Sequence, residues 1–498
     1  EGKIKHDIHL ADDDLFVRTV RQASRRVAYT LIVLGMFVGS ILMIAFEQPY
    51  GTSRYGHFLL VVASLLILFL SLRETVIPLL FMAGMLFPIA YNFGTNIFLG
   101  QISYITEALA TVLQLGVTMD FSIFLLHRFE EERDGGADDE TAMVRAVQKT
   151  FSSISASSLT TIAGFLALCT MRLTLGMDIG LVMAKGVLLG VICTLTVLPA
   201  LIMTFRGAIR RHTHRTFIPK LSRTARFVVK HRAPILIVFL VCFLPFSIAQ
   251  AKTPVYYTIF DALPQDLPGI AGTNRLKEDF DMTTSHFIIV EDDVPEKELQ
   301  ALTEALGQVD GVHQVLSYET FLGAGIPERF LPQEARSLFE AGGHKLLLVN
   351  SSYKSGSDAQ NAQLDEMTAL VKQYDPNGVI TGEGAMTKDL IEVADEDFRS
   401  VNVSSIVLVF LIVALSFRSL SVPVLLVAAI ESAIMINMGI PYFIDDSLPF
   451  IASIVIGTIQ LGATVDYAIL MTTRFREELN AGRSTKDAVQ TAVEQCSQ

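Results

Sequence analysis

Two aspartates lie inside long apolar stretches of the chain, each within a copy of the same motif. The first copy reads Gln114-Leu-Gly-Val-Thr-Met-Asp120 and the second Gln460-Leu-Gly-Ala-Thr-Val-Asp466, 346 residues apart without a gap. A carboxylate in a membrane helix is costly, about 3 kcal/mol or more, and such residues usually face a bundle interior on an ion or proton path. The duplication therefore predicts two proton-relay carboxylates in symmetry-related places. Neutral, hydrogen-bonded packing residues are the alternative.

Each aspartate has small and polar neighbours at helical spacing. Gly116 and Gly462 precede the aspartates by four residues and so share their helix face. Small residues at such positions let membrane helices approach closely, so we expect the two aspartate helices to face each other. The same motif offers hydroxyl and amide partners for the carboxylates: Gln114, Thr118, Gln460 and Thr464.

The two copies differ at the position after the aspartate. Tyr467 follows Asp466, whereas Phe121 follows Asp120. A tyrosine hydroxyl can hydrogen-bond the opposite carboxylate, which phenylalanine cannot do. We therefore expect Asp466 and Tyr467 to tune the site and Asp120 to be the freer acid.

Two further polar features lie in apolar stretches. Seven hydroxyl residues lie between Ser152 and Thr161, among them Ser157. They indicate either a water-lined proton path or plain helix packing, because hydroxyls also bond the carbonyls of their own helix. Glu431, in Ala-Ala-Ile-Glu-Ser-Ala-Ile, is either an additional relay carboxylate or a cavity-lining residue.

The elements that position these residues must be membrane helices. The 498 residues are 51% hydrophobic and 18% charged, with a mean hydropathy of +0.46, far from a soluble average. The sequence predicts an α-helical polytopic membrane protein with about ten spans of the length a hydrocarbon core requires. The windows lie near 27–46, 57–72, 75–98, 104–126, 153–171, 177–204, 233–250, 401–417, 420–441 and 448–472. Amphipathic stretches at 128–149 and 474–494 are expected to lie on the membrane surface.

Charge is distributed unevenly and predicts the orientation. The stretch 205–232 carries nine Lys or Arg and no acid, which by the positive-inside rule makes it cytoplasmic. Residues 252–399 carry 26 Asp or Glu against 11 Lys or Arg and then fall on the extracytoplasmic side. We expect a multi-pass membrane protein with this acidic segment outside.

The repeat extends beyond the aspartate motif and defines the domains. Ser71-Leu-Arg73 matches Ser416-Phe-Arg418, and Asn92-Phe-Gly94 matches Asn437-Met-Gly439. Two parallel repeats are expected because both aspartate helices end on arginine-containing stretches at the cytoplasmic side. The first repeat lacks an outer domain between 46 and 57, and the second is expected to be truncated at residue 498. The expected domains are a leader (1–26), the first repeat (27–204), a basic linker (205–232), the first helix of the second repeat (233–252), an outer domain (253–399) and the rest of the second repeat (400–498).

The outer domain alternates short β-rich runs with helical ones. Strands are predicted at 286–290, 313–317, 345–349 and 379–381, and helices at 295–309, 332–340, 358–374 and 386–399. This order fits a split βαβ, ferredoxin-like α+β module.

Other chemistry has no support in the sequence. No Walker loop, metal cluster or catalytic Ser, His and Asp arrangement is recognisable, so we expect no cofactor, no metal, no catalytic residues and no nucleic-acid partner. The four cysteines indicate neither a disulfide nor a metal site.

The two repeats, the inserted outer module and the motif Gln-Leu-Gly-x-Thr-x-Asp resemble the resistance-nodulation-division (RND) superfamily. Within it the chain is similar to the MmpL (mycobacterial membrane protein large) branch. The resemblance implies a secondary active transporter of a bacterial cytoplasmic (plasma) membrane rather than an enzyme. Asp120, Asp466 and Tyr467 would relay protons, and the outer module would pass a lipid or another hydrophobic or amphiphilic compound outward by proton antiport. Phe121 departs from the usual Asp-Tyr pair.

Two other readings belong to the same superfamily. A sterol-sensing or signalling relative would share the bundle without proton-driven export, and a protein-translocation accessory would act on polypeptide through the outer domain. The accessory usually places an arginine beside its membrane acid, and none is present here. Membrane lipids and the hydrophobic substrate are the expected partners, with homo-oligomers or accessory proteins left open.

Overall fold

The structure is a computed structural model that describes residues 62–63, 65–70, 72, 74–211, 222–258, 263–264, 266–318, 320 and 337–496. Within these residues eight helices are long and apolar enough to cross a membrane. The leader and the first predicted span lie outside the described residues, as do parts of the second predicted span and of the predicted helix 332–340. The described end of that predicted helix, 337–340, forms a turn and the first residue of a strand, so the prediction of a helix is wrong there. The chain forms two compact units, one of 1–242, 403–434 and 458–498 and the other of 243–402 and 435–457.

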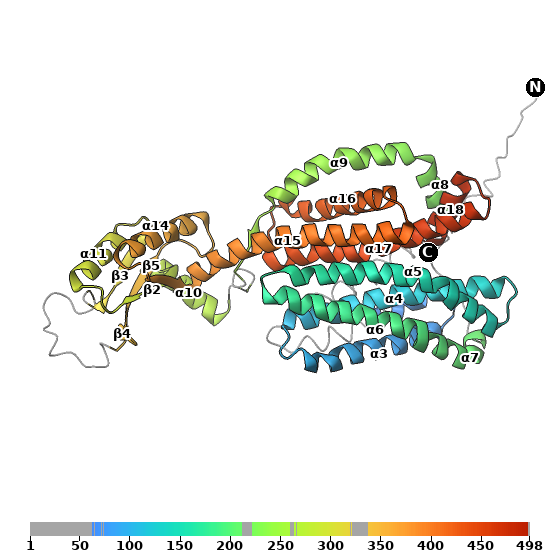
Figure 1. The fold of residues 1–498 in the computed structure, drawn as a ribbon, viewed down its shortest axis with the longest axis horizontal. Helices are drawn as coiled ribbons and strands as arrows, with labels where there is room; N and C mark the ends of the chain where they lie inside the picture. The colour runs from blue at the N-terminus through green and yellow to red at the C-terminus, as the bar shows by residue number, and fades with distance from the viewer. Residues whose placement is uncertain are drawn as a thin grey trace, which may run out of the picture. The chain divides into compact units, whose positions relative to one another are not determined.

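The first unit contains a bundle of four helices from the first repeat (Figure 1). They are α3 (Ile77–Thr95), α4 (Tyr104–Asp134), α5 (Asp139–Ala167) and α6 (Thr174–Thr204), with 3₁₀ turns η1 (Asn96–Phe98) and η2 (Leu168–Thr170) after α3 and α5 and the short α7 (Arg206–Arg211) after α6. Its core includes Phe81, Leu125 and Ile202, all almost fully buried. Apolar residues from several helices thus hold the bundle together.

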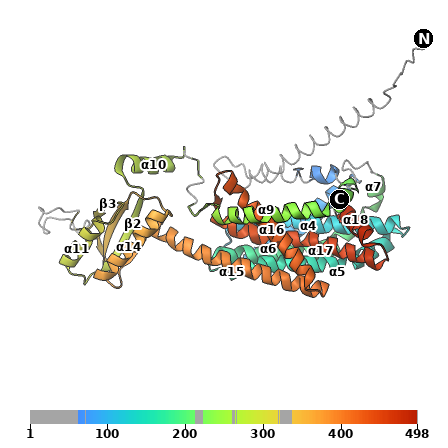
Figure 2. The same ribbon diagram turned by 90° about the horizontal axis from the view of Figure 1, so that it is seen from above.

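The second repeat supplies α8 (Ser222–Lys230), α9 (Arg232–Lys252), α15 (Glu383–Phe417), α16 (Ser421–Phe443), α17 (Phe450–Asn480) and α18 (Thr485–Cys496). Figure 2 shows most of these helices from a second direction. The repeat extends to helix caps: the Asp138 carboxylate accepts from the Thr141 backbone N–H, and the Ser484 hydroxyl accepts from the Asp487 backbone N–H. The two cap residues, Asp138 and Ser484, are 346 residues apart, which is the spacing of the repeat. The two turns after the aspartate helices are therefore capped in the same way.

The turns at 135–138 and 481–484 correct one sequence expectation. The stretches 128–149 and 474–494 are not separate surface helices. Instead α4 and α17 run on to Asp134 and Asn480, and new helices begin at Asp139 and Thr485. Gly136, with φ +92°, and the Asp138 cap interrupt the helix, since this φ is easily adopted only by glycine.

The second unit contains a small α+β module (Figure 1). Its strands are β2 (Thr284–Glu291), β3 (Val312–Leu316), β4 (Glu340–Ala341), β5 (His344–Ser351) and β6 (Val379–Gly382), with helices α10 (Pro268–Phe280), α11 (Glu296–Gly307) and α14 (Asp358–Tyr374). The sheet order is β3-β5-β2-β6, all antiparallel, with β4 added on β5. The order β2-α11-β3-β5-α14-β6 is a split βαβ arrangement and fits the ferredoxin-like prediction.

Alternation along the strands builds the module's core. Ile288 and Val290 of β2 and Leu347 and Val349 of β5 are fully buried and pack against α11 and α14. Period-two alternation places such residues on one face of the sheet. A separate pair of strands, β1 (Val255–Tyr256) and β7 (Leu448–Pro449), joins the residues after α9 to those before α17.

Candidate functional site: a paired carboxylate centre

The two aspartate helices lie side by side and run in the same direction. Tyr467 of α17 donates its hydroxyl hydrogen to a carboxylate oxygen of Asp120 of α4. Further toward the C-terminal ends of both helices, Arg474 Nη2 lies 2.9 Å from Glu131 Oε1. Two contacts that advance together along both helices require parallel helices, in keeping with the predicted parallel repeats.

Asp466 is held by a third helix, α5. The Thr161 hydroxyl donates to Asp466 Oδ2 at 2.7 Å and the Thr160 hydroxyl to Oδ1 at 3.3 Å. Asp466 is 8% exposed, and Ser157, one turn before Thr160, is fully buried on the same face. The polar stretch at the start of the predicted 153–171 span therefore provides the immediate surroundings of this carboxylate.

The two carboxylates have unequal surroundings. Asp120 is exposed and takes a tyrosine hydroxyl from the other repeat, while Asp466 is buried and takes threonine hydroxyls from the first repeat. At the position equivalent to Tyr467, Phe121 is 2% exposed and packed in the bundle. The phenylalanine thus fills a core position that offers no polar group to Asp466.

The motif glycines do not bring the two aspartate helices together, which corrects the helix-approach role expected for Gly116. A Cβ on Gly116 would meet nothing within 4 Å. The close approach is between α17 and α5: a Cβ on Gly164 would lie 3.2 Å from the Gly462 Cα, and the Thr161 hydroxyl reaches the Gly462 carbonyl at 3.3 Å. Gly164 has no partner in the motif, so the sequence alone did not single it out.

The first copy's polar motif residues face α3 and α6. The Gln114 side chain accepts from Asn92 Nδ2 at 2.8 Å and donates to the Gly186 carbonyl at 3.2 Å. Thr118 is buried against Gly190, where an added Cβ would lie 2.7 Å from its hydroxyl oxygen. These residues therefore link three helices of the first repeat and make no hydrogen bond to either carboxylate in the described structure.

The remaining predicted site residues stay predictions. Gln460 and Thr464 are half-buried in α17. Glu431 is half-buried in α16, and its Oε1 is buried without a hydrogen-bond partner among the residues described. No contact of these three side chains with Asp120 or Asp466 is among the described hydrogen bonds.

Two charged residues of α6, Asp178 and Lys185, are not among the predicted site residues, although each interrupts an apolar stretch. Lys185 Nζ donates to the Asn92 carbonyl at 3.0 Å and to Asn96 Oδ1 at 2.6 Å. Asp178 accepts from the Ser103 backbone N–H at 2.7 Å. Both tie α6 to neighbouring segments of the first repeat, and the signal that could have found them is the isolated charge itself.

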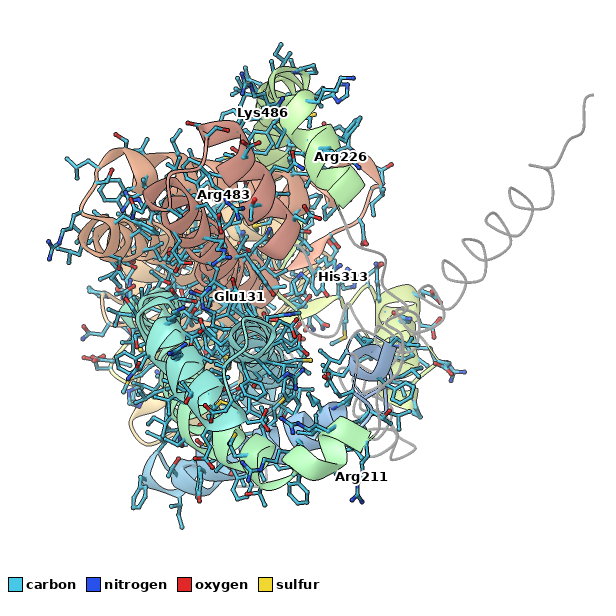
Figure 3. The ribbon with its side chains drawn as sticks, turned by 90° about the vertical axis from the view of Figure 1, so that its right-hand side faces the viewer. Glu131, Arg211, Arg226, His313, Arg483 and Lys486 are labelled. Atoms are coloured by element: carbon cyan, nitrogen blue, oxygen red, sulfur yellow. The ribbon has the colours of Figure 1, made fainter. Side chains whose placement is uncertain are left out.

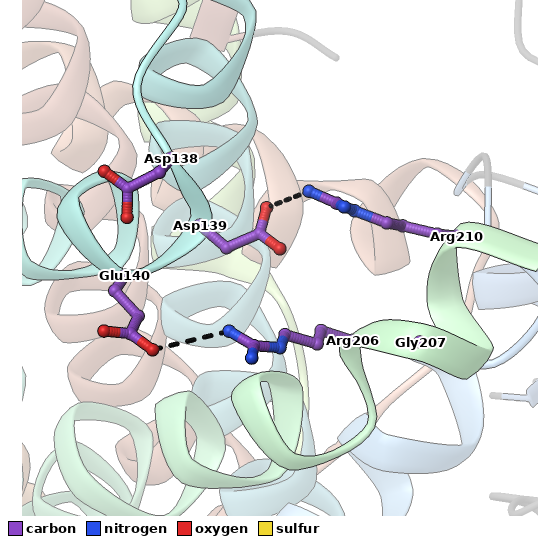
Figure 4. Close-up of a pocket in the computed structure, with 6 residues that line it drawn as sticks. All are labelled: Asp138, Asp139, Glu140, Arg206, Gly207 and Arg210. Atoms are coloured by element: carbon purple, nitrogen blue, oxygen red, sulfur yellow. Dashed lines mark hydrogen bonds and ion pairs between the residues drawn. The ribbon is translucent and has the colours of Figure 1, made fainter.

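One end of the first unit is rich in ion pairs and is called the basic end here. It comprises the last turns of α4 and α17, the start of α5 and helix α7. In Figure 4, Arg210 pairs with Asp139 at 2.9 Å and Arg206 with Glu140 at 3.5 Å across a small cavity. Two acids at the start of α5 thus pair with two arginines of α7, and the third acid of the cavity lining, Asp138, is the cap of α5.

The second unit contains a larger cavity of about 420 Å³. Tyr257 lies in it, stacked on Phe450 with ring centroids 5.6 Å apart, and donates to Asp395 Oδ1 at 3.4 Å. Burial and the nearby Asp395 charge raise the pKa of Tyr257 to about 12. The lining mixes polar and apolar groups: Ser247, Gln250, Thr253, Ala394, Phe398, Met438, Leu448, Ser453 and Ile454 among others. No group of His, Cys, Asp and Glu in the described ranges is arranged to hold a metal ion.

A duplicated helical bundle with an inserted split βαβ module and paired carboxylates defines a class of multi-pass membrane proteins. The chain belongs to the MMPL family, whose model matches residues 42–235 and 278–498. This agrees with the MmpL-like resemblance of the motifs.

Relatives and one solved structure extend the comparison. The membrane protein SCO0839 of Streptomyces coelicolor is 25% identical over 447 residues, covering 83% of this chain and 60% of that protein. The hopanoid transporter HpnN of Rhodopseudomonas palustris is 24% identical over 276 residues, covering 54% of this chain and 30% of HpnN. The crystal structure of SecDF, a translocon-associated membrane protein of Thermus thermophilus, has a TM-score of 0.53 at 16% identity, covering 93% of this chain and 55% of SecDF. The likeness to SecDF is one of fold.

The chain spans about half the length of the relatives that it matches over most of its own length.

Proposed function

We propose that this chain is part of a secondary active transporter that uses the proton gradient to export a lipid or another amphiphile. The observation that carries the proposal is the hydrogen bond between Tyr467 and Asp120, which joins the two copies of the membrane carboxylate motif. A proton bound or released at one copy thereby changes a contact of the other repeat. Such a contact can convert proton movement into relative movement of helices.

The surroundings of Asp466 support a proton site. Its carboxylate has hydroxyl partners from α5 and no cation, since the ion pairs of the described residues do not include Asp466 or Asp120. Hydroxyls can donate to a carboxylate and accept from a carboxylic acid, so Thr160 and Thr161 accommodate both protonation states. An arginine or lysine would instead hold the carboxylate permanently ionised.

The cavity around Tyr257 suits an amphiphile. Aromatic and aliphatic side chains would contact the apolar part of the molecule, while Asp395, Gln250 and Tyr257 offer donors and acceptors for a polar headgroup. We expect the acidic outer module to lie on the extracytoplasmic side of a bacterial plasma membrane, with membrane lipids as partners. Because the relative HpnN is a hopanoid transporter, a hydrophobic compound is the first cargo to test.

A protein-translocation accessory is the second candidate because of the fold likeness to SecDF. It predicts that proton movement depends on a polypeptide in transit rather than on a lipid. A sterol-sensing role predicts no net transport at all.

Transport in proteoliposomes separates these functions. The full-length protein would be tested with a fluorescent lipid under an imposed proton gradient, as wild type, Asp120→Asn and Asp466→Asn. We expect gradient-dependent lipid movement that both variants lose. Glu107→Gln is the matched control, because it makes the same carboxyl-to-amide change on an exposed site of α4. Lipid movement independent of the gradient, or undiminished in both aspartate variants, would contradict the proposal.

A further inference from the structure

Eight residues after each aspartate, the chain repeats the stretch Arg-Phe-x-Glu-Glu, at 128–132 and 474–478. In the structure both stretches are in the last turns of unbroken helices, α4 and α17, at the basic end. Figure 3 looks onto this end, where Glu131 is labelled. Four side chains from the two stretches meet and are called the arginine–glutamate quartet: Arg128, Glu131, Arg474 and Glu477.

The quartet is reciprocal between the two repeats. Within each helix, Arg128 lies 2.7 Å from Glu131 and Arg474 lies 2.8 Å from Glu477. Across the helices, Arg474 lies 2.9 Å from Glu131 and Arg128 lies 3.7 Å from Glu477. Each arginine therefore binds the glutamate of its own helix and the equivalent glutamate of the other repeat.

Burial makes these pairs more consequential than ordinary surface ion pairs. The side chains of Arg128 and Arg474 are only 15% and 17% exposed, whereas Glu131 and Glu477 are 47% and 41% exposed. A partly buried guanidinium that loses its carboxylate is left without compensation, which costs more than breaking an exposed pair. Each helix contributes one arginine and one glutamate, so moving the helices apart leaves no net charge on either one but breaks the two cross-helix ion pairs.

The quartet and the Tyr467–Asp120 contact lie on the same helix faces. Tyr467 and Arg474 are seven residues apart, about two helical turns, and Asp120 and Glu131 are eleven residues apart, about three turns. The two contacts together define one register of α4 against α17. A slide or rotation of one helix that breaks the quartet would also move the tyrosine hydroxyl away from the Asp120 carboxylate.

The geometry points to Arg128 and Arg474 as positioning residues that hold α4 and α17 in the register at which Tyr467 reaches Asp120. This inference rests on the proposed proton-coupled function and adds the residues that align its two halves. Arg474 is the stronger anchor, because it lies 2.9 Å from Glu131 across the helices, whereas Arg128 lies 3.7 Å from Glu477. Within α17, Arg474 also lies 3.0 Å from Glu478. The equivalent acid of the first repeat, Glu132, pairs instead with Lys149 and Arg145 of α5.

The test combines a distance measurement with transport. Spin labels at the exposed positions His127 of α4 and Met471 of α17, in the full-length protein without its native cysteines, report the helix register. Arg474→Gln should broaden the distance distribution and lower proton-coupled transport about tenfold, with Arg128→Gln weaker in both. Arg145→Gln is the matched control because it removes an exposed arginine that reaches Glu132 only at 4.0 Å.

A double-mutant cycle tests whether the residues act as a unit. Glu131→Gln combined with Arg474→Gln should be much less harmful than the sum of the single changes, since each single change already breaks the cross-helix pair. The inference would be overturned if Arg474→Gln left the distance distribution or the pH profile of transport unchanged. It would also be overturned if the effects of Glu131→Gln and Arg474→Gln were strictly additive. If the aspartate variants retain transport, the proposed function fails, while the distance measurement still decides on the register.

Discussion

The Tyr467 hydroxyl donates to the Asp120 carboxylate, although 347 residues separate them in the chain. The bond joins the second copy of a duplicated motif to the acid of the first. The reverse bond is absent because Phe121 occupies the position equivalent to Tyr467, and Asp466 instead accepts from Thr160 and Thr161. Two acids in equivalent sequence positions therefore have different donors.

Removing the tyrosine hydroxyl should weaken the coupling between the repeats. Tyr467→Phe keeps the ring and deletes the donor to Asp120, and a hydrogen bond to a charged group contributes about 1.5–3 kcal/mol. We expect proton-coupled transport in proteoliposomes to fall about tenfold or more. Tyr442→Phe, the same change on an exposed tyrosine of α16, should have no effect. Equal activity of both variants would mean that the bond has no role in coupling.

The two threonines should differ in importance. Thr161 donates to Asp466 at 2.7 Å and Thr160 at 3.3 Å, so Thr161→Val should reduce transport more than Thr160→Val. Valine keeps the shape and removes the hydroxyl. Thr196→Val is the control, because Thr196 is exposed on α6 and bonds only its own helix in the described structure. A larger effect at Thr160, or a loss at Thr196, would argue against a direct role of these hydroxyls at Asp466.

The three glycines near the site should respond differently to alanine. Gly164→Ala forces a Cβ to 3.2 Å from the Gly462 Cα, and overpacking of this kind costs about 1–3 kcal/mol. Gly116→Ala enters open space and should be neutral or stabilising, since alanine favours helix. Gly462→Ala, with its nearest atoms at 3.6 Å, should be tolerated. Thermal unfolding in detergent checks the order, which would be reversed if Gly116 were the contact glycine.

The outer module should lose stability as pH falls because of His286. This side chain is fully buried in β2, neither ring nitrogen has a hydrogen-bond partner among the described residues, and burial lowers its pKa to about 4 from 6.5. Since the folded state disfavours the charged form, the stability is present above pH 6.5 and is lost as pH falls toward 4, about 3 kcal/mol in all.

Hydrogen exchange of β2 in the full chain measures this effect. Protection should decrease between pH 6.5 and 4 after correction for intrinsic exchange, and His286→Leu should flatten the dependence. His344→Leu, at an exposed position on β5, should leave it unchanged. Protection that is independent of pH in the wild type would contradict the burial argument.

Much of the local structure could be predicted, because periodicity is a property of the chain itself. The predicted helix 358–374 coincides with α14, and each of the four strands overlaps an observed one within a few residues. The turn at 135–138 also had a signal in Gly136 and Asp138. The expectation of one surface helix over 128–149 does not take this turn into account, although the run 130–141 is polar apart from two glycines and Ala137.

The partners in the site could not be predicted, because they depend on which helices pack together. The motif marks Gly462 and Asp466, but nothing in it indicates that α5 supplies Gly164 and Thr161. A period of 3.6 residues gives a helix face without naming its neighbour. The expectation that Gly116 faces Gly462 rests on the symmetry of the two repeats. In the structure Gly462 of α17 instead packs against Gly164 of α5.

We propose that Asp120 and Asp466 together bind the protons that drive transport. Proton entry into proteoliposomes containing the full-length protein, followed with an internal pH indicator during lipid movement, tests it most directly. Asp120→Asn and Asp466→Asn should each abolish substrate-dependent proton entry, while Glu107→Gln retains it. Proton entry at the wild-type rate in either aspartate variant would contradict the account.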